Sequence, residues 1–434
     1  MADYSKYNLS DNPFPETAVI DPLSEDVRVN GGIFHEGIFS KEIENLRRKT
    51  EQGVNVIYLS GIEFDRGIGK SALMIHHMQS LKGGAGSTCV YVRCGEKDKP
   101  RDAARKVVEQ WHCCSDLWES FKVAFTEFSR SQGDSLLAPD AVEKLFIDFP
   151  KLPNRLPLSR YTHTRDSRKI ADAFASWLAS RIKTGTRSLA VFARDYLSEP
   201  AEFLESIRGR SVDPIDLYEA CIKFLGSFGY GRHYVFLDQF EDMVMGTSKA
   251  SMGKFALEMK SIIRASAGNV IIFVTLHPNS ETSLKIPAAQ DMTGVAPLDA
   301  VHRIDVMILD TKGDSAIGLA GEYFRHFREG DAPYATYPVE PELLDFMCYM
   351  NRGLIRGFLQ QLHNALDYGV GNGWPELTFE YAREHSLDVL GREVENKTVD
   401  AFYKKKGRVS PPSLAGRSWA GVVKGYKDGV AKQG

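Results

Sequence analysis

The stretch that decides the fold is Val54-Asn55-Val56-Ile57-Tyr58-Leu59-Ser60-Gly61, followed after a short gap by Gly67-Ile68-Gly69-Lys70-Ser71-Ala72. Residues 54–59 form a short apolar run, which predicts a buried strand of a parallel sheet. A helix is expected to start near Lys70. Glycines in such a loop let backbone N–H groups approach an anion, and the helix dipole places its positive end there. Residues 67–72 are therefore predicted to bind phosphate.

The loop departs from the strict phosphate-loop pattern GxxxxGK[ST]. Counted back from Gly69, its first glycine should stand at position 64, where the sequence has Phe64; the nearest earlier glycine is Gly61. The departure is either a substitution or a longer loop. Lys70 is expected to neutralise the β- and γ-phosphates of a nucleoside triphosphate, and Ser71 to ligate Mg²⁺. A chance Gly-Lys-Ser in a surface loop is the alternative, and the placement between strand and helix argues against it.

An acidic motif follows farther along the chain. Val235-Phe236-Leu237-Asp238 is an apolar run that ends in an acid, which is the Walker B arrangement. It predicts that Asp238 emerges beside the phosphate loop and holds hydrated Mg²⁺. An aspartate that only caps a strand is the alternative. Because the two motifs occur in this order, we predict that the chain binds ATP with Mg²⁺.

The fold class follows from the spacing of the apolar runs. Residues 89–92 and 270–274 predict two more strands, and the segments between the strands are predicted to be helical. The expected fold is α/β, a P-loop core with a parallel sheet, a large helical insertion and a small all-α lid. The expected domains are an N-terminal arm at 1–37, an ATPase core at 38–305 with a basic insertion at about 129–215, a helical lid at 306–396, and a basic, weakly ordered tail at 397–434.

These motifs resemble those of AAA+ ATPases and their STAND relatives. In most AAA+ proteins a glutamate directly follows the Walker B aspartate and activates the attacking water, whereas this chain has Gln239 there. The sequence Asp238-Gln239-Phe240-Glu241-Asp242 is similar to the DQFE form of STAND ATPases. The resemblance implies Glu241 as the base, with a structural surface acid as the alternative. It also implies an ATPase whose hydrolysis is slow or stimulated by a partner.

The resemblance implies polar sensors of the γ-phosphate. Thr275 and His277 follow the fourth apolar run, where AAA+ proteins carry a sensor that contacts the γ-phosphate or the attacking water. An ordinary loop histidine is the alternative for His277. Asn351-Arg352-Gly353-Leu354-Ile355-Arg356 resembles the sensor-2 motif of the lid, with Arg356 as the sensor and Arg352 as the alternative.

The resemblance also implies an arginine that reaches the nucleotide of a neighbouring subunit. Arg303, in Val301-His302-Arg303-Ile304, is similar to that residue, and Arg264 is a rival for the role. Either side chain could instead be a solvated surface arginine. A residue of this kind implies that the chain forms an oligomer with itself.

The resemblance covers roughly residues 30–370 and is specific for the superfamily. With the preceding Asn12-Pro13-Phe14 segment, the chain resembles origin-recognition initiators, ExeA-type secretion ATPases and transposition regulators of the TniB kind. An ATPase of a phage-defence operon would look similar. Too few patterned residues follow the lid for the winged helix that initiators usually carry.

Two basic segments are candidates for nucleic-acid contact. Residues 151–194 carry ten Lys or Arg residues against two Asp, and residues 397–434 carry nine against two. Basic side chains with interleaved aromatics such as Tyr161 and Trp177 suit phosphate contact and base stacking. Solvated faces or surfaces for acidic partner proteins are the alternative, and Trp177 is expected in the core. The nucleic-acid candidates are Arg155, Arg160, Arg165, Arg168, Lys169, Arg181 and Lys183.

Composition limits the remaining classes. The 434 residues are 43% hydrophobic and 26% charged with a formal net charge of −3, as in an ordinary soluble protein, so a DNA-binding surface would be a local patch. The six cysteines form no matched CxxC pairs, which predicts no zinc site and fits a reducing, intracellular compartment. The chain has no apolar signal core and no run of eighteen apolar residues, so we expect a cytoplasmic protein without membrane insertion.

Three functional hypotheses follow. The first is an ATP-controlled AAA+ switch that assembles on DNA or a DNA-bound complex and recruits partner proteins. The second is a STAND-like signalling or defence ATPase that acts through protein partners without touching DNA. The third, a metabolic P-loop kinase, is disfavoured by the long lid with Arg356 and by the absence of an evident acceptor-site motif.

Overall fold

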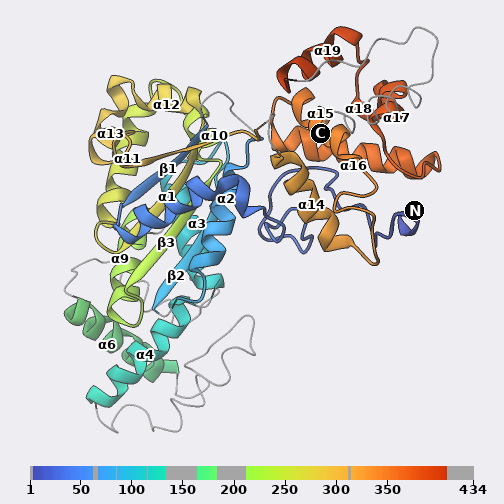
Figure 1. Ribbon diagram of the computed structural model, residues 1–434. Coiled ribbons are helices and arrows are strands. Elements are labelled where there is room, and N and C mark those ends of the chain that lie inside the picture. Colours follow the sequence, from blue (N-terminus) through green and yellow to red (C-terminus); the bar gives the residue numbers. More distant parts are fainter. Residues whose placement is uncertain are drawn as a thin grey trace, which may run out of the picture. The chain divides into compact units, whose positions relative to one another are not determined.

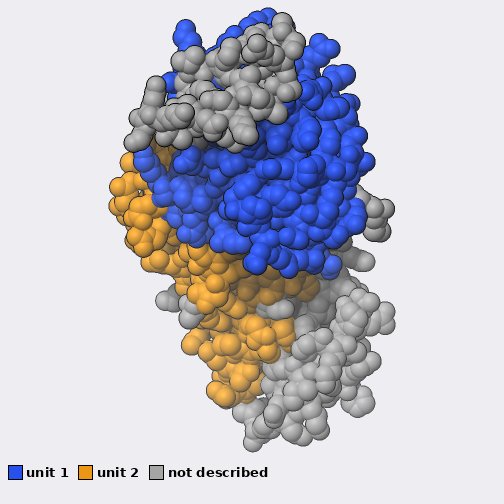
Figure 2. All heavy atoms as spheres, turned by 45° about the vertical axis from the view of Figure 1, so that its right-hand side comes forward, with its two compact units in different colours: residues 1–43, 61–76, 306–434 blue, residues 44–60, 77–305 orange. Residues whose placement is uncertain are grey.

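The computed structural model describes residues 3–61, 67–84, 86–114, 116–132, 164–182, 212–310 and 314–407. The chain divides into two compact units (Figure 2). Unit 1 consists of residues 1–43, 61–76 and 306–434, and unit 2 of residues 44–60 and 77–305. Unit 2 carries nearly the whole sheet, and unit 1 carries the phosphate loop together with the helices that follow the last strand.

The sheet has five strands in the order β2-β3-β4-β1-β5. Figure 1 labels β1, β2 and β3. The strands are β1 (Val56–Gly61), β2 (Ser87–Arg93), β3 (Arg232–Asp238), β4 (Val270–Leu276) and β5 (Arg303–Val306). The pairings of β2 with β3, β3 with β4 and β4 with β1 are parallel, which confirms the predicted α/β fold with a parallel sheet. The sequence analysis did not identify β5 as a strand, because it is only four residues long.

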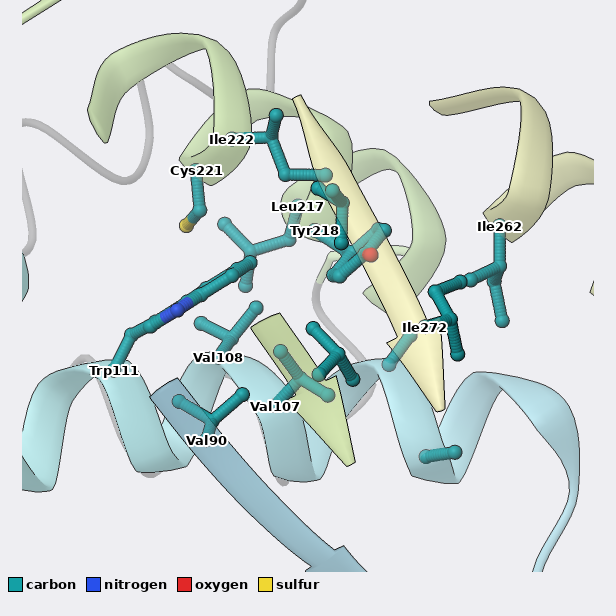
Figure 3. Packing of buried hydrophobic residues seen from close by; sticks show 14 of the residues in the cluster. Val90, Val107, Val108, Trp111, Leu217, Tyr218, Cys221, Ile222, Ile262 and Ile272 are labelled. Atoms are coloured by element: carbon teal, nitrogen blue, oxygen red, sulfur yellow. The ribbon is translucent and has the colours of Figure 1, made fainter. Parts of the chain in front are cut away.

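Successive side chains along each strand point to opposite faces of the sheet. Val90 and Ile272 lie in a large core that also contains Trp111 and Tyr218 (Figure 3). Val235 of β3 belongs to the same core. This core joins the sheet to α3 (Pro100–Cys113), α9 (Pro214–Ser227) and α11 (Met252–Ala265). A helix-covered face of this kind is what a parallel sheet requires, because its strands are buried on both sides.

The opposite face is also closed. Phe236 and Phe273, neighbours on β3 and β4, stack with ring centroids 4.5 Å apart. His77 of α2 (Lys70–Leu81) packs edge-on against Phe273 at 5.3 Å and contacts Thr50 of α1 (Ser40–Glu51) at 3.0 Å. The end of α1 and the end of α2 therefore lie against the second face.

The remaining helices fall into two groups along the chain. Those before β5 are α4 (Asp116–Gln132), α6 (Thr164–Ile182), α10 (Phe240–Met245), α12 (Pro278–Leu284) and α13 (Gln290–Val295). Those after β5 are α14 (Ser315–Phe327), α15 (Pro341–Met350), α16 (Ile355–Gly371), α17 (Phe379–Glu384), α18 (Ser386–Leu390) and α19 (Asn396–Lys405). Short 3₁₀ helices lie at η1 (Ser5–Tyr7), η2 (Glu36–Phe39) and η6 (Pro287–Ala289).

The helical segment that follows β2 is divided into two helices, α3 and α4. Cys114 caps α3 with non-helical dihedrals (φ −81°, ψ 4°) and ends it. α4 and α6 then pack through aromatic rings, with Phe125 and Phe174 5.3 Å apart. Trp177 stacks on Phe174 at 5.9 Å and borders the large core, which confirms its predicted place there.

In unit 1 the N-terminal residues pack onto the helices that follow β5. Tyr7 and Phe14, within the segment predicted as an N-terminal arm over residues 1–37, are fully buried in the same core as those helices. Asn12 donates to Asp367 of α16 at 2.8 Å, and the carbonyl oxygen of Phe14 lies 2.8 Å from His363 Nδ1. Apolar anchors spaced along a polar segment allow this docking without secondary structure.

The expected start of the tail at residue 397 falls inside α19. Phe402 and Tyr403 are buried in the core of unit 1, and Lys406 pairs with Asp345 of α15 at 2.8 Å. These apolar side chains anchor the start of the basic segment. Residues 408–434 lie outside the described residues. Of the helices in the described ranges, none is both long enough and apolar enough to cross a membrane.

Candidate functional site

The phosphate-loop motif forms a tight turn in unit 1 that requires glycine. Gly67 has φ +84° and Gly69 has φ +95°, values that side-chain-bearing residues rarely adopt. α2 begins at Lys70, and the N–H of Leu73 donates to the carbonyl oxygen of Gly69 at 2.9 Å. Residues 62–66, including the position where Phe64 replaces a glycine, lie outside the described residues.

Both glycines also lie where a side chain would not fit. A Cβ atom at Gly67 would lie 3.1 Å from Cβ of Arg356, and one at Gly69 would lie 2.8 Å from Cζ of Phe39 and 3.1 Å from Cδ1 of Ile355. The N–H of Arg356 donates to the carbonyl oxygen of Gly67 at 3.1 Å. The structure thus brings the start of α16 against the loop within unit 1.

The loop has the chemistry that a polyphosphate requires. The Lys70 side chain is buried, at 6% relative exposure, directly at the start of the 12-residue helix α2. The N-terminus of such a helix presents free backbone N–H groups and a positive potential. Ser71 and Ala72 follow in its first turn and are half-buried. A cation, a hydroxyl and turned backbone amides at one helix end fit a nucleotide's phosphates and the hydroxyl ligand that Mg²⁺ takes there.

Arg356 contacts two parts of unit 1. Its backbone reaches Gly67, and its Nε donates to the carbonyl oxygen of Ala18 at 3.2 Å. The alternative sensor, Arg352, lies in the turn before α16 with φ +54°, followed by Gly353 with φ +76°. The backbone of Arg356 bonds directly to the phosphate loop.

An aromatic stack lies beside the loop, and the sequence analysis did not identify it. Phe39, which touches the Gly69 position, stacks on Phe34 with centroids 5.3 Å apart, and Phe34 stacks on His76 of α2 at 4.2 Å. His76 Nε2 lies 3.5 Å from Glu36 Oε1. Burial lowers the pKa of His76 below its ordinary value, opposed by the Glu36 carboxylate, which favours a neutral ring at neutral pH.

The predicted Walker B carboxylate, Asp238, lies at the carboxyl end of β3 in unit 2. Asp238 is 2% exposed and accepts hydrogen bonds from the Tyr91 hydroxyl at 2.5 Å and from the N–H of Gln239 at 2.9 Å. Donors on both oxygens fix the orientation of the carboxylate. Tyr91 was not among the predicted site residues. Its place between Val90 and Val92, on the opposite face of the strand, was visible in the sequence, but its pairing beside β3 was not.

Glu241 and Thr275 are brought together next to Asp238. The Thr275 hydroxyl lies 2.6 Å from Oε2 of Glu241 and 3.3 Å from Oδ1 of Asp238. All three residues are buried, with Thr275 at 0% relative exposure. A threonine hydroxyl has one proton to donate, so the shorter contact to Glu241 is the stronger bond. Two predicted carboxylates and one predicted sensor thus share a polar cluster.

Gln239, which occupies the usual glutamate position, points elsewhere. Its backbone is left-handed (φ 55°, ψ 30°), a conformation costly for a residue with a side chain. Its side-chain oxygen accepts a hydrogen bond from Arg93 Nε at 3.0 Å. The strained turn ends β3 and starts α10, whose first turn carries Glu241.

His277 forms the N-cap of α12. Its Nδ1 accepts from the N–H groups of Asn279 at 3.2 Å and Ser280 at 3.4 Å. Because Nδ1 accepts, Nε2 carries the proton of the neutral ring. Capping of α12 accounts for the histidine at this position. The sensor role of His277 stays a prediction.

Arg303 is held within its own subunit. Its Nη1 pairs with Glu281 of α12 at 2.8 Å and its Nε pairs with Asp305 at 2.5 Å. Glu281 also accepts a hydrogen bond from Ser60 at the end of β1. Arg264, the rival for a role towards a neighbouring subunit, is exposed in the last turn of α11. The sequence could not show that Glu281 would lie between Ser60 and Arg303.

The described part of the basic insertion is α6. Lys169 is exposed, and the Arg181 side chain is 62% exposed and lies 3.6 Å from Glu127. Arg165 and Arg168 belong to α6, but their side chains are not among the described ones. Three further candidates lie outside the described residues: Arg155, Arg160 and Lys183.

The similarity of this chain to known proteins is low. No protein-family model matches the chain, and no curated protein matches it. Four solved chains match its structure. One is a Walker-type ATPase of Pyrococcus abyssi, with 13% sequence identity, a TM-score of 0.35, and coverage of 81% of this chain and 71% of that chain.

Proposed function

We propose that the chain is a Mg²⁺-dependent ATPase of the AAA+ type that works as a nucleotide-controlled switch. The observation that carries the proposal is the cluster of Asp238, Glu241 and Thr275, joined by one hydroxyl at the carboxyl ends of β3 and β4. The glycine turn at the start of α2 supports it independently, because its backbone conformation and buried lysine suit a polyphosphate. Sequence motif and local geometry agree at both places.

Each residue has a role in this proposal. Lys70 and the N–H groups of residues 67–72 would bind the phosphates, and Ser71 and Asp238 would be the residues that hold Mg²⁺. Bound Mg²⁺ would neutralise charge on the phosphate oxygens. Glu241 accepts the proton of the attacking water, and Thr275 orients Glu241. Since Gln239 occupies the usual glutamate position, we expect slow basal hydrolysis.

The switch is proposed to act through Arg356. This residue joins the start of α16 to the phosphate loop through its backbone, and its side chain is bonded to Ala18. A γ-phosphate near the loop would compete for the guanidinium, so triphosphate and diphosphate states would differ in the packing of unit 1. The packing of unit 1 in the triphosphate state would promote oligomerisation and recruitment of partner proteins.

The proposed setting is DNA or a DNA-bound complex. The support is the basic composition of residues 151–194, with exposed Lys169 and Arg181 in the described part. A defence-operon ATPase and a transposition-regulator-like ATPase both fit this description.

The second candidate function is a STAND-like signalling or defence ATPase that acts through protein partners without binding DNA. It is favoured by the DQFE sequence and by Gln239, which is bonded to Arg93 and cannot serve as a base. In this case ATP would be held through many cycles of partner contact with negligible turnover.

ATP turnover tests the proposal. The full chain is assayed with and without double-stranded DNA at low salt, beside Lys70→Ala and Glu241→Gln. Matched controls are Lys82→Ala, an exposed lysine just after α2, and Asp242→Asn, the acid next to Glu241. Turnover lost in both test variants and kept in both controls supports the ATPase, and stimulation by DNA supports the DNA-bound setting.

The other outcomes separate the alternatives. Tight ATP binding without turnover, abolished by Lys70→Ala alone, favours the STAND-like switch. Absence of ATP binding by the wild-type chain contradicts the proposed function altogether. Turnover that survives Glu241→Gln assigns the base to another residue.

A further inference from the structure

The helix that carries Glu241, α10, is short. Both of its ends are contacted by a segment that consists of the last residue of β2 and the three residues after it. α10 spans only Phe240–Met245, so its backbone hydrogen bonds alone cannot define its direction. Phe240, Met243 and Val244 anchor one side of it in the core. The segment that contacts its ends is residues 93–96, which we name the β2–α3 connection.

At the start of α10, contacts from the end of β2 hold the turn at Gln239. The N–H of Cys94 donates to the carbonyl oxygen of Asp238 at 2.8 Å. Arg93 Nε donates to the Gln239 side chain at 3.0 Å, and the Tyr91 hydroxyl donates to the Asp238 carboxylate at 2.5 Å. These bonds stabilise a left-handed residue that, unlike glycine, is strained in that conformation.

At the end of α10, the backbones touch. A Cβ atom at Gly246 would overlap the carbonyl oxygen of Glu96 and lie 2.8 Å from its carbonyl carbon. Gly246 has φ −70°, which any residue adopts, so its backbone conformation does not require glycine. Only the close approach of Glu96 explains why a side chain cannot be placed there.

The β2–α3 connection is itself fixed. Asp98 accepts from the N–H of Gly95 at 2.7 Å and pairs with Lys106 of α3 at 2.5 Å. Lys106 also donates to the carbonyl oxygen of Arg93 at 3.1 Å. The connection is therefore tied to α3 and can serve as a rigid support for α10.

We propose that the β2–α3 connection is a clamp that positions α10, and that Arg93 and Gly246 are positioning residues for the carboxylate of Glu241. The clamp holds Gln239 in its strained turn and fixes the far end of the helix, so that Glu241 stays within reach of Thr275 and Asp238. This inference rests on the proposed role of Glu241 as the base. The amide oxygen of Gln239 is the acceptor for Arg93 in this clamp.

The first test adds one methyl group at the far end. In Gly246→Ala the helix must move away from Glu96, and a displacement of the base is expected to lower kcat about tenfold or more with KM for ATP within about twofold. Gly294→Ala is the matched control, since Gly294 lies in helix α13 with open space at its Cβ position. A kcat equal to that of the control would overturn the proposal.

The second test uses rescue and does not depend on the first variant folding. Arg93→Ala is expected to lower kcat about fivefold, because the strained turn loses one charge-assisted bond. Adding Gln239→Gly should restore kcat, since glycine adopts the left-handed turn without strain. No loss in Arg93→Ala, or a loss that glycine does not restore, contradicts the clamp.

A third measurement separates this inference from the proposed function. Amide hydrogen exchange at residues 243–247 is followed in the nucleotide-free full chain. Faster exchange in Arg93→Ala, reversed by Gln239→Gly, supports the clamp even if the wild type shows no turnover. In that case only the ATPase proposal fails. Unchanged exchange together with unchanged kcat refutes the clamp while the ATPase proposal stands.

Discussion

Gly69→Ala is the substitution that tests the phosphate loop most directly. Two separate features of Gly69 oppose a side chain: its φ of +95° and the position of its Cβ atom, 2.8 Å from Phe39 and 3.1 Å from Ile355. Phe39 cannot move freely, because its ring stacks on Phe34. Strain and overlap therefore act at the same position.

The two contributions can be estimated separately. A non-glycine residue in the left-handed region costs roughly 1–2 kcal/mol. Overpacking against a ring held by a stack costs about 1–3 kcal/mol more. We expect Gly69→Ala to lower the free energy of unfolding of unit 1 by about 3 kcal/mol in total. Relief of this strain would displace the loop, so affinity for Mg²⁺-ATP should fall about tenfold or more.

Gly53→Ala is the matched control. Gly53 follows α1 with φ +71° and has open space at its Cβ position, so this variant carries the strain without the overlap. Thermal unfolding and titration of a fluorescent ATP analogue are measured for both variants. A melting-temperature loss of roughly 2–4 °C is expected for Gly53→Ala, with unchanged nucleotide affinity. The loss for Gly69→Ala should be at least twice as large.

Equal losses of melting temperature in the two variants would refute the argument from overlap. Wild-type nucleotide affinity in Gly69→Ala would refute the loop itself, because a phosphate-binding turn cannot absorb this change without moving. A low melting temperature with normal affinity would show that Gly69 serves packing alone.

Further predictions concern other buried polar groups. Thr275→Val keeps the shape of the side chain and removes the hydroxyl that orients Glu241, so kcat for ATP should fall at least about fivefold. A calorimetric ATP affinity that falls in parallel would contradict a role in orienting the base. Burial lowers the pKa of His233 from 6.5 to about 4, so the unfolded chain binds a proton that the folded chain does not as pH falls through that window. The free energy of unfolding should therefore decrease as the pH is lowered from 6.5 to 4, by at most about 3 kcal/mol. If denaturant titrations gave a His233→Gln variant the same dependence of stability on pH as the wild type, this explanation would be ruled out. Asn12→Ala removes a hydrogen-bond donor to Asp367, so the free energy of unfolding should fall by about 1–3 kcal/mol and the melting temperature of the full chain should fall with it. An unchanged melting temperature would mean that the N-terminal segment contributes little to the stability of unit 1.

The strands and the loop could be predicted because they depend on local patterns. Apolar runs at 54–59 and 270–274 correspond to β1 and β4, since strands buried on both faces are continuous in hydrophobicity. Gly67 and Gly69 have positive φ values, which glycine adopts without strain. β5 was not predicted, because a four-residue strand has too few positions to show a period.

The packing of the N-terminal residues could not be predicted for a different reason. Tyr7 and Phe14 lie in a polar segment without periodicity, and their partners are more than 300 positions away in sequence. The predicted roles of Thr275, Arg356 and the basic residues of the insertion stay predictions, because each depends on a bound nucleotide or nucleic acid.

The sequence by itself determined the class of fold and the types of residue at the candidate site, because hydrophobic period, glycine and terminal acids act within a few residues of one another. Tertiary structure decided which of these residues meet. The register of β3 beside β2 brings Tyr91 to Asp238, and that of β4 beside β3 brings Thr275 to Glu241. Such partners lie far apart along the chain, and strand order and register are set by the packing of the whole core, which no short window of sequence contains.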